Sequence, residues 1–299
     1  MDKNKKIGFG VIGYGGMGSW HASTCADDFK DTAELIGIYD IKPERRAAAE
    51  AEGIHAFSSR EELLADERID LVTVDQNRRW DPDFKCVQKI LADNELGKVF
   101  RIESRVQGSR GIPGDWRNQK AHGGGMVLDW GIHLLDQALR IGEGRKLISV
   151  YAELTNVTNE ECDDGFRVTL IFEGDLSMYV EVTTSNFIEL PRWYILGENG
   201  SAVINDWDLN GEIVKVSDWE NRDAVPILAG VGLTKTMAPR TDDTIKHYPL
   251  PKVDSSWTQF YENVFAALRG EEEQLITHDQ QRRLLKLCLL YTSPSPRDR

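Results

Sequence analysis

The stretch Ile7-Gly-Phe-Gly-Val-Ile-Gly-Tyr-Gly-Gly-Met-Gly18 decides the fold of the first part of the chain. Residues 7–12 form a short apolar run, which is typical of a buried parallel strand. The glycines that follow make a GxGxxG turn. Its first glycine allows the tight turn, its second lets the backbone approach a pyrophosphate, and its third lets a helix pack closely on the strand. A helix over residues 17–26 then directs its N-terminal N–H groups at the phosphates.

A second apolar strand, residues 33–39, ends in Asp40, which lies 22 residues after Gly18. An acid at this distance hydrogen-bonds the ribose of a dinucleotide and repels a 2′-phosphate, so NAD is favoured over NADP. Lys42 and Arg45 are close in sequence and weaken that preference. The alternative is a glycine-rich turn that binds nothing. The predicted cofactor-binding residues are Gly13, Tyr14, Gly15, Gly16, Met17, Gly18 and Asp40.

The pattern continues as an α/β domain over residues 1–75. Pro43 opens a helix, residues 61–64 predict another, and residues 69–74 predict a third strand. The order β-α-β-α-β is half of a doubly wound sheet, the Rossmann arrangement.

The length and net charge of the chain exclude some classes of function. The 299 residues suggest two domains, and 36 basic against 49 acidic residues give a net charge of −13. An acidic chain argues against a nucleic-acid or anionic membrane surface, and no run approaches the roughly 18 apolar residues of a membrane helix. The four scattered cysteines show no metal spacing, so we expect a cytoplasmic protein without a metal site.

Residues 76–287 predict a second domain of a different kind. Short strands joined by turns such as Glu173-Gly-Asp175 and Glu198-Asn-Gly200 indicate an open antiparallel sheet with helices on one face. The fold class is therefore α/β plus α+β. The expected strands cover residues 99–107, 147–154, 166–172, 176–184, 192–196, 201–205 and 212–216.

A helix predicted over residues 124–140 carries the most informative pair. Asp129 and His133 are spaced i, i+4, so they share a face beside the apolar stripe. An imidazole titrates near neutrality and a carboxylate can orient it, so the pair suits proton transfer. From the pattern alone, an ion pair on the helix surface is the simpler interpretation.

Four motifs together resemble one family, the glucose–fructose oxidoreductase / inositol dehydrogenase / rhizopine-catabolism (Gfo/Idh/MocA) oxidoreductases. They are Gly13–Gly18, Gln76-Asn-Arg-Arg-Trp-Asp-Pro82, Asp115-Trp-Arg117 and Gly123–Asp136. The resemblance implies a Rossmann domain followed by an open antiparallel sheet, and hydride transfer between NAD(P) and a sugar, cyclitol or related polyol. It implies that His133 takes the hydroxyl proton, while Asp129 binds substrate or tunes His133.

The same resemblance suggests how the substrate and a second subunit are bound. A tryptophan can lie on the apolar face of a sugar ring, and an arginine donates several hydrogen bonds to hydroxyl groups. Ordinary packing or surface ion pairs are the alternative for each of these residues. Family members pair through the open sheet, which implies a dimer or tetramer. The candidate substrate residues are Asn77, Arg79, Trp80, Trp116 and Arg117.

One departure from the family follows Val74. Relatives carry further residues here, including a Glu-Lys-Pro motif whose lysine contacts the nicotinamide and the reacting hydroxyl. No Glu-Lys-Pro occurs in this chain, and Lys42-Pro43 follows Ile41 instead. We expect an internal deletion, either a sequence error or a genuine loss. A catalytically silent dinucleotide- or sugar-binding relative, or a non-functional fragment, is therefore the alternative function.

The last residues, 288–299, form a third segment. The helical pattern before them ends at Leu287, and Ser-Pro-Ser-Pro then stops any helix. The segment resembles a translated sequencing adapter, so we expect a non-native tail; a natural disordered tail is the alternative.

Overall fold

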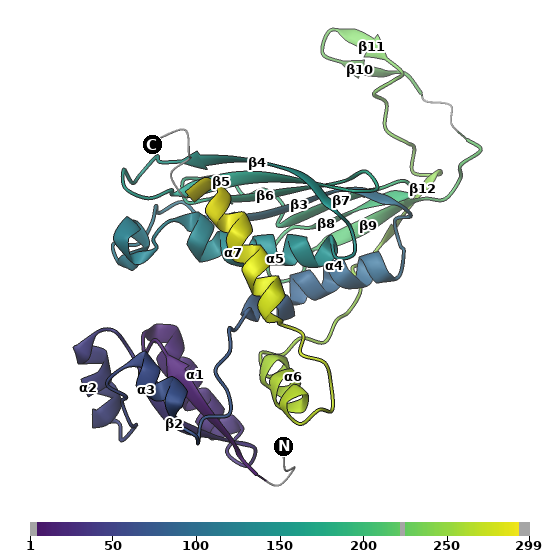
Figure 1. Ribbon diagram of the computed structural model, residues 1–299. Helices are drawn as coiled ribbons and strands as arrows, with labels where there is room; N and C mark the ends of the chain where they lie inside the picture. Colours follow the sequence, from purple (N-terminus) through teal and green to yellow (C-terminus); the bar gives the residue numbers. More distant parts are fainter. Residues whose placement is uncertain (1–4, 222–224, 293–299) are drawn as a thin grey trace. The chain divides into compact units, whose positions relative to one another are not determined.

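A computed structural model describes residues 5–221 and 225–292 (Figure 1). The chain divides into two compact units, which are described separately. The first comprises Met1–Asp75 and Thr258–Ile276, and the second comprises Gln76–Trp257 and Thr277–Arg299.

The first unit begins with the expected alternation of strands and helices. Strand β1 (Ile7–Ile12) pairs in parallel with β2 (Ala33–Tyr39). Helix α1 (Gly16–Asp28) connects them, and α2 (Pro43–Ala51) and α3 (Arg60–Ala65) follow. A small core of Tyr14, Ala22, Ile38 and Ala49 fixes α1 and α2 on β2.

The third strand predicted over residues 69–74 is reduced to a single bridge between Leu71 and Phe9. Asp70 and Leu71 donate hydrogen bonds to the carbonyl of Gly8, and Gly10 donates to the carbonyl of Leu71. Beyond that point Val72 and Val74 are exposed. Within the described residues no strand flanks this segment on its other side, so it leaves the sheet after one bridge.

Residues 258–276 also differ from the domain boundary expected from sequence, which placed them in the second domain. Helix α6 (Thr258–Leu268) packs with the first unit. The ring of Phe29 lies 5.4 Å from those of Tyr261 and Phe265, and the Tyr261 hydroxyl hydrogen-bonds His21 Nδ1. Burial of these aromatic rings holds the returning segment on α1.

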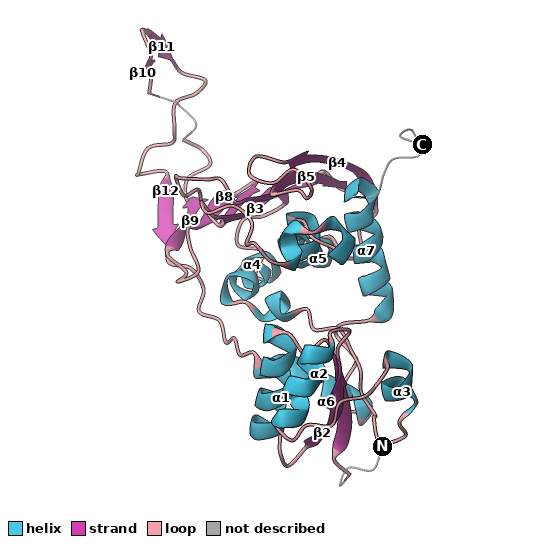
Figure 2. Cartoon of the chain, turned by 90° about the vertical axis from the view of Figure 1, so that its left-hand side faces the viewer, coloured by secondary structure: helices cyan, strands magenta, loops and turns pink. Residues whose placement is uncertain are grey.

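The second unit contains an eight-stranded sheet in the order β12-β9-β8-β7-β3-β6-β5-β4. All neighbours are antiparallel except β3 and β6, which run parallel. The strands are β3 (Val99–Gln107), β4 (Leu147–Thr155), β5 (Gly165–Phe172), β6 (Leu176–Thr183), β7 (Trp193–Gly197), β8 (Gly200–Ile204), β9 (Gly211–Val216) and β12 (Ile245–Tyr248). A hairpin of β10 (Ile227–Ala229) and β11 (Gly232–Thr234) stands apart from that sheet (Figure 2).

Helices α4 (Pro82–Ala92), α5 (Ile132–Ile141) and α7 (His278–Thr292) cover one face of this sheet (Figure 1). Their apolar residues join the inward residues of the strands in one continuous core. The opposite face carries charged side chains at alternate positions. There Glu103 pairs with Arg101 and Arg105, and Glu181 pairs with Arg105 and Arg167.

Helix α7 extends past the expected end at Leu287 to Thr292, and Cys288 is 1% exposed. Leu284, Leu287 and Cys288 recur at i, i+3 and i+4, which places them on the stripe that packs on α5. The break expected at residue 288 is therefore wrong by several residues. The expected Ser-Pro-Ser-Pro tail, residues 293–299, lies outside the described residues.

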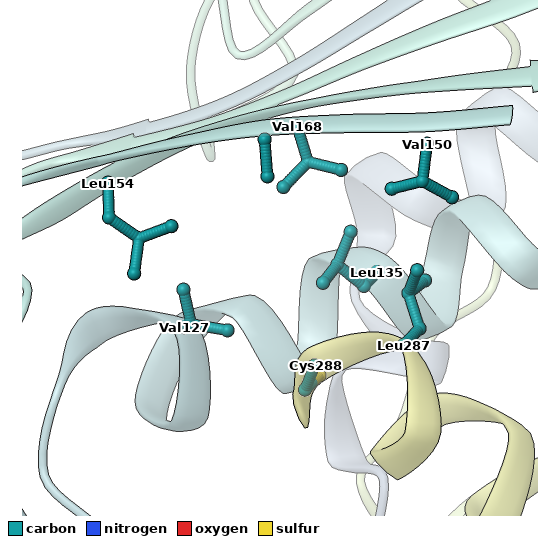
Figure 3. A pocket seen from close by; sticks show the side chains of 8 residues that line it. Val127, Leu135, Val150, Leu154, Val168, Leu287 and Cys288 are labelled. Carbon is teal, nitrogen blue, oxygen red and sulfur yellow. The ribbon is translucent and has the colours of Figure 1, made fainter. Parts of the chain in front are cut away.

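A cavity of about 10 Å³ lies between α7, α5 and the inward face of β4 and β5 (Figure 3). Only apolar side chains and Cys288 line it. At the size of a single water and without polar partners, it is a packing gap and not a ligand site. No helix in the described part of the chain is both long and apolar enough to cross a bilayer.

Candidate functional site

The glycine turn of the first unit is shaped to admit a ligand. Gly13 has φ +94°, which favours glycine, and a Cβ at Gly18 would lie 1.7 Å from the carbonyl oxygen of Gly13. A Cβ at Gly15 or Gly16 would meet nothing within 4 Å. Helix α1 starts at Gly16, and no side chain caps its first N–H groups. These open, uncapped donors fit the phosphates of a dinucleotide.

Asp40 lies next to this turn, as predicted from its spacing. Its carboxylate accepts hydrogen bonds from the backbone N–H of Tyr14 at 2.6 Å and of Lys42 at 2.8 Å. Arg46 donates to the carbonyl of Asp40 at 2.6 Å. Asp40 thus ties the end of β2 to the glycine turn and places a negative charge there.

Tyr14 and Met17 take different places around the turn. The Tyr14 side chain is buried in the core and donates a hydrogen bond to Glu52. Its side chain therefore points away from the turn, and its backbone N–H faces it. Burial, together with Glu52, raises the pKa of Tyr14 to about 12. Met17, by contrast, is 57% exposed at the start of α1.

Two alanine substitutions separate binding from folding at the turn. Gly15 has an extended backbone, with φ −81° and ψ −164°, so Gly15→Ala is expected to keep the melting temperature and to weaken NAD binding at least tenfold. Gly18→Ala is expected to lower the melting temperature by several degrees, because its Cβ overlaps the Gly13 carbonyl. Thermal unfolding and NADH fluorescence titration measure the two effects. Equal NADH affinity in Gly15→Ala and wild type would contradict a ligand role for the turn.

In the second unit, the helix predicted over residues 124–140 has two parts. Residues Val127–Gly131 form a π-helix, η4, and α5 continues from Ile132. Asp163 holds its start: its carboxylate accepts from the Val127 N–H at 2.8 Å and its carbonyl accepts from the Met126 N–H. A Cβ at Gly125 would lie 2.1 Å from the Asp163 carboxylate, so this approach requires glycine.

The Asp163 carboxyl is 8% exposed, and burial raises its pKa to about 6. Its hydrogen bonds with the backbone oppose that rise. A π-turn is uncommon and is found mostly at functional sites.

Asp129 lies on this π-turn and His133 lies just after it, at the start of α5, and each has its own anchor. Asp129 accepts a hydrogen bond from Arg117 Nε at 3.0 Å, and Arg117 also pairs with Asp115 at 2.8 Å. His133 Nδ1 lies 3.1 Å from the side-chain oxygen of Gln76. The structure therefore holds a carboxylate and an imidazole one turn apart by two independent contacts.

Two of the predicted substrate residues are buried and make contacts within the second unit. Arg79 is 7% exposed and binds Asp136 through two nitrogens, at 2.6 and 2.7 Å, and Gln280 through a third. Trp80 is likewise buried, at 7% exposed. Both residues lie on the 3₁₀-helix η1 (Asn77–Trp80) and are packed within the fold; the substrate role of Arg79 and Trp80 stays a prediction.

The other three predicted substrate residues are accessible. Asn77 is exposed on η1, and Trp116 is 41% exposed. Arg117 lies 4.8 Å over the Trp116 ring while it pairs with Asp129. Their accessibility keeps Asn77, Trp116 and Arg117 as substrate candidates.

Next to Asp129 the structure shows a stack that sequence reasoning missed. The Arg78 guanidinium lies 4.5 Å from the Trp130 ring and 5.4 Å from the Trp207 ring, and the two rings are 6.2 Å apart. Trp207 is 45% exposed. The sequence gives no sign of this stack, because residues 130 and 207 are far apart in the chain and only the fold joins them.

Comparison with known proteins identifies the family. Residues 7–95 match the model described as the oxidoreductase family, NAD-binding Rossmann fold, and residues 84–203 match the GFO/IDH/MocA C-terminal domain. The crystal structure of an NAD-binding protein from Listeria innocua is 37% identical, with a TM-score of 0.85 and 95% of each chain covered. The chain belongs to the GFO/IDH/MocA oxidoreductase family. The family and fold class predicted from the motifs are confirmed.

Two curated relatives of this GFO/IDH/MocA chain are more distant. An uncharacterized oxidoreductase of Schizosaccharomyces pombe is 32% identical over 46% of this chain and 39% of that protein. The scyllo-inositol 2-dehydrogenase (NADP(+)) of Bacillus subtilis is 24% identical over 69% of this chain and 57% of that protein. The chain thus spans between about two fifths and three fifths of these relatives' lengths. The internal deletion and the non-native tail remain predictions.

Proposed function

We propose that this chain is an NAD-dependent oxidoreductase that transfers hydride between nicotinamide and a sugar, cyclitol or related polyol. The observation that carries the proposal is the independent anchoring of Asp129, on the π-turn, and of His133, at the start of α5. Membership of an oxidoreductase family and the open glycine turn support it. The Bacillus subtilis relative is named for an inositol substrate, which agrees with the polyol class.

The glycine turn and Asp40 would hold the cofactor. The backbone of Gly13–Gly18 would bind the diphosphate, and the Asp40 charge would favour NAD over NADP. Bound nicotinamide supplies a ring carbon that accepts or returns hydride.

Side chains of this protein would transfer the proton of the substrate hydroxyl. When an alcohol is oxidised, its C–H leaves as hydride, its O–H proton passes to His133, and a carbonyl forms. Asp129 accepts a hydrogen bond from a second substrate hydroxyl, while Arg117 keeps its carboxylate in place. No lysine of a Glu-Lys-Pro motif takes part, since the chain has none.

A substrate panel tests the proposal. NADH binding is measured by fluorescence, and turnover is then followed with NAD or NADP and a set of inositols, hexoses and sugar acids. We expect binding of NADH and turnover of at least one polyol, with NAD preferred. NADH binding without turnover of any member would favour the catalytically silent alternative, and absence of binding would reject the cofactor site.

The exposed Trp207 ring would stack on the apolar face of the substrate. Trp207→Ala is expected to raise KM about three- to tenfold, the loss of one aromatic contact. Trp219→Ala is the matched control, because Trp219 is 43% exposed and has Arg240 at 4.9 Å over its ring. Steady-state kinetics on both variants give the comparison. An equal rise in KM for the two would contradict stacking of the substrate on Trp207.

We also propose a homo-oligomer, a dimer or tetramer, that joins through the open sheet face and works in the cytoplasm. That face carries the Glu103 and Glu181 ion pairs and the exposed ring of Tyr151. Light scattering is expected to give a multiple of the 33.8 kDa chain mass. A monomer at all concentrations would contradict the interface.

A further inference from the structure

Two glutamines, one buried and one partly buried, form a hydrogen-bonded chain that ends at His133. Gln76 is 2% exposed, and its side-chain oxygen lies 3.1 Å from His133 Nδ1. Its side-chain nitrogen donates to the Gln281 oxygen at 2.9 Å. Gln281 stands on α7, so residues from three distant parts of the sequence meet here.

The direction of the hydrogen bonds from His133 through Gln76 to Gln281 determines which ring nitrogen of His133 carries a hydrogen. An amide oxygen only accepts hydrogen bonds, so His133 Nδ1 must carry the hydrogen that Gln76 receives. A neutral imidazole carries one ring hydrogen, and its lone pair is then on Nε2. When His133 gains a proton, Nδ1 still donates to the same oxygen. With the amide reversed, two donors would face each other in the charged state.

We propose that Gln76, oriented by Gln281, sets the tautomer of His133 so that Nε2 is the atom that accepts the substrate proton. Gln76 and Gln281 are positioning residues that act through the imidazole. This inference rests on the proposed function for its kinetic consequence. The tautomer itself is a property of the free protein and is measured without substrate.

The charged side chains named below, from the elements around His133, are each paired with another side chain. On the helix that bears His133, Asp129 is paired with Arg117 and Asp136 with Arg79. On the neighbouring η1, Arg78 is paired with Asp81 at 3.2 Å. On α7, Gln280 and Gln281 are the residues in contact with this region, and Asp279 pairs with Arg282. Gln76 is the uncharged group among them that contacts Nδ1.

Long-range ¹H–¹⁵N NMR of the free protein provides the first test. The chain has six histidines, and the His133 signals are assigned as those absent from His133→Asn. We expect the neutral ring to carry its hydrogen on Nδ1 in wild type and to become a mixture in Gln76→Leu. A wild-type ring protonated on Nε2 would overturn the proposal.

Kinetics provide the second test. Gln76→Leu is expected to lower kcat about tenfold with little change in KM, and Gln281→Leu to lower it less. Gln76→Glu keeps an acceptor at Nδ1, so it should retain the tautomer. Its acidic limb of kcat against pH should move up by about one unit, because a nearby carboxylate favours the imidazolium. An unchanged pH profile in Gln76→Glu would count against contact between residue 76 and the base.

A matched variant controls for the loss of a buried glutamine. Gln137 is fully buried on the same helix, but its amide donates to the carbonyl of Arg78 at 2.7 Å. Gln137→Leu is expected to lower stability and to leave the His133 tautomer unchanged. If His133→Asn keeps full turnover, the catalytic role of His133 fails, while the NMR result still decides the tautomer.

Discussion

His133→Asn is expected to lower turnover by about 10² to 10⁴-fold, the range that a positioned general base contributes. Asparagine preserves the side chain's polarity and can still meet Gln76, but it cannot take up a proton near neutral pH. NADH affinity should stay within twofold of wild type, because the expected cofactor contacts come from the glycine turn and Asp40. The measurement is kcat on the best substrate of the panel together with NADH titration.

His122→Asn is the control for this experiment. His122 precedes the same glycine run, is exposed and bonds to Gln119 at 2.6 Å. Its replacement should change kcat by less than twofold. Equal turnover in His133→Asn and wild type would remove His133 from the reaction, whatever the result for His122.

Breaking the Arg79–Asp136 pair is expected to cost about 3–5 kcal/mol of unfolding free energy in the second unit. Both side chains are below 10% exposed and are joined by two hydrogen bonds, so Asp136→Leu would leave a buried guanidinium without its carboxylate. Chemical denaturation, followed by near-UV circular dichroism, measures the loss.

Two further variants test whether burial and charge cause this loss of stability. Asp93→Asn removes an exposed ion pair with Lys89, 2.8 Å long, and should cost only a few tenths of a kcal/mol. The double variant Arg79→Met with Asp136→Leu should recover much of the loss, because neither charge is then left buried alone. A double variant as unstable as Asp136→Leu would show that shape, not charge, maintains this contact.

Much of the architecture is readable from local pattern. The glycine turn and the first two strands follow from residues 7–40, because the chemistry of a tight turn is local. The strands of the second unit follow from period-two alternation between turns. The missing third strand was not predictable in this way, since a strand persists only where neighbours pair with it.

In the candidate site, too, local spacing is predictable from sequence and contacts between distant residues are not. The spacing of Asp129 and His133 identifies a pair, but the π-turn that carries Asp129 and leads into α5 depends on Asp163, which lies 34 residues after Asp129. Arg79 reads as a sugar-binding arginine until its carboxylate partner at 136 is seen. Gln76 opens one of the family motifs, but its contact with His133 is not readable from sequence, because only the fold brings α5 and α7 beside it.

The return of residues 258–276 to the first unit has a consequence for biosynthesis. Residues 1–75 are synthesised well before Tyr261 and Phe265, yet these two rings complete the packing of the first unit. Domains usually fold in the order of their synthesis. Here residues 1–75 must wait, incompletely packed, until some two hundred further residues have emerged, and the second unit is completed later still, when α7 follows.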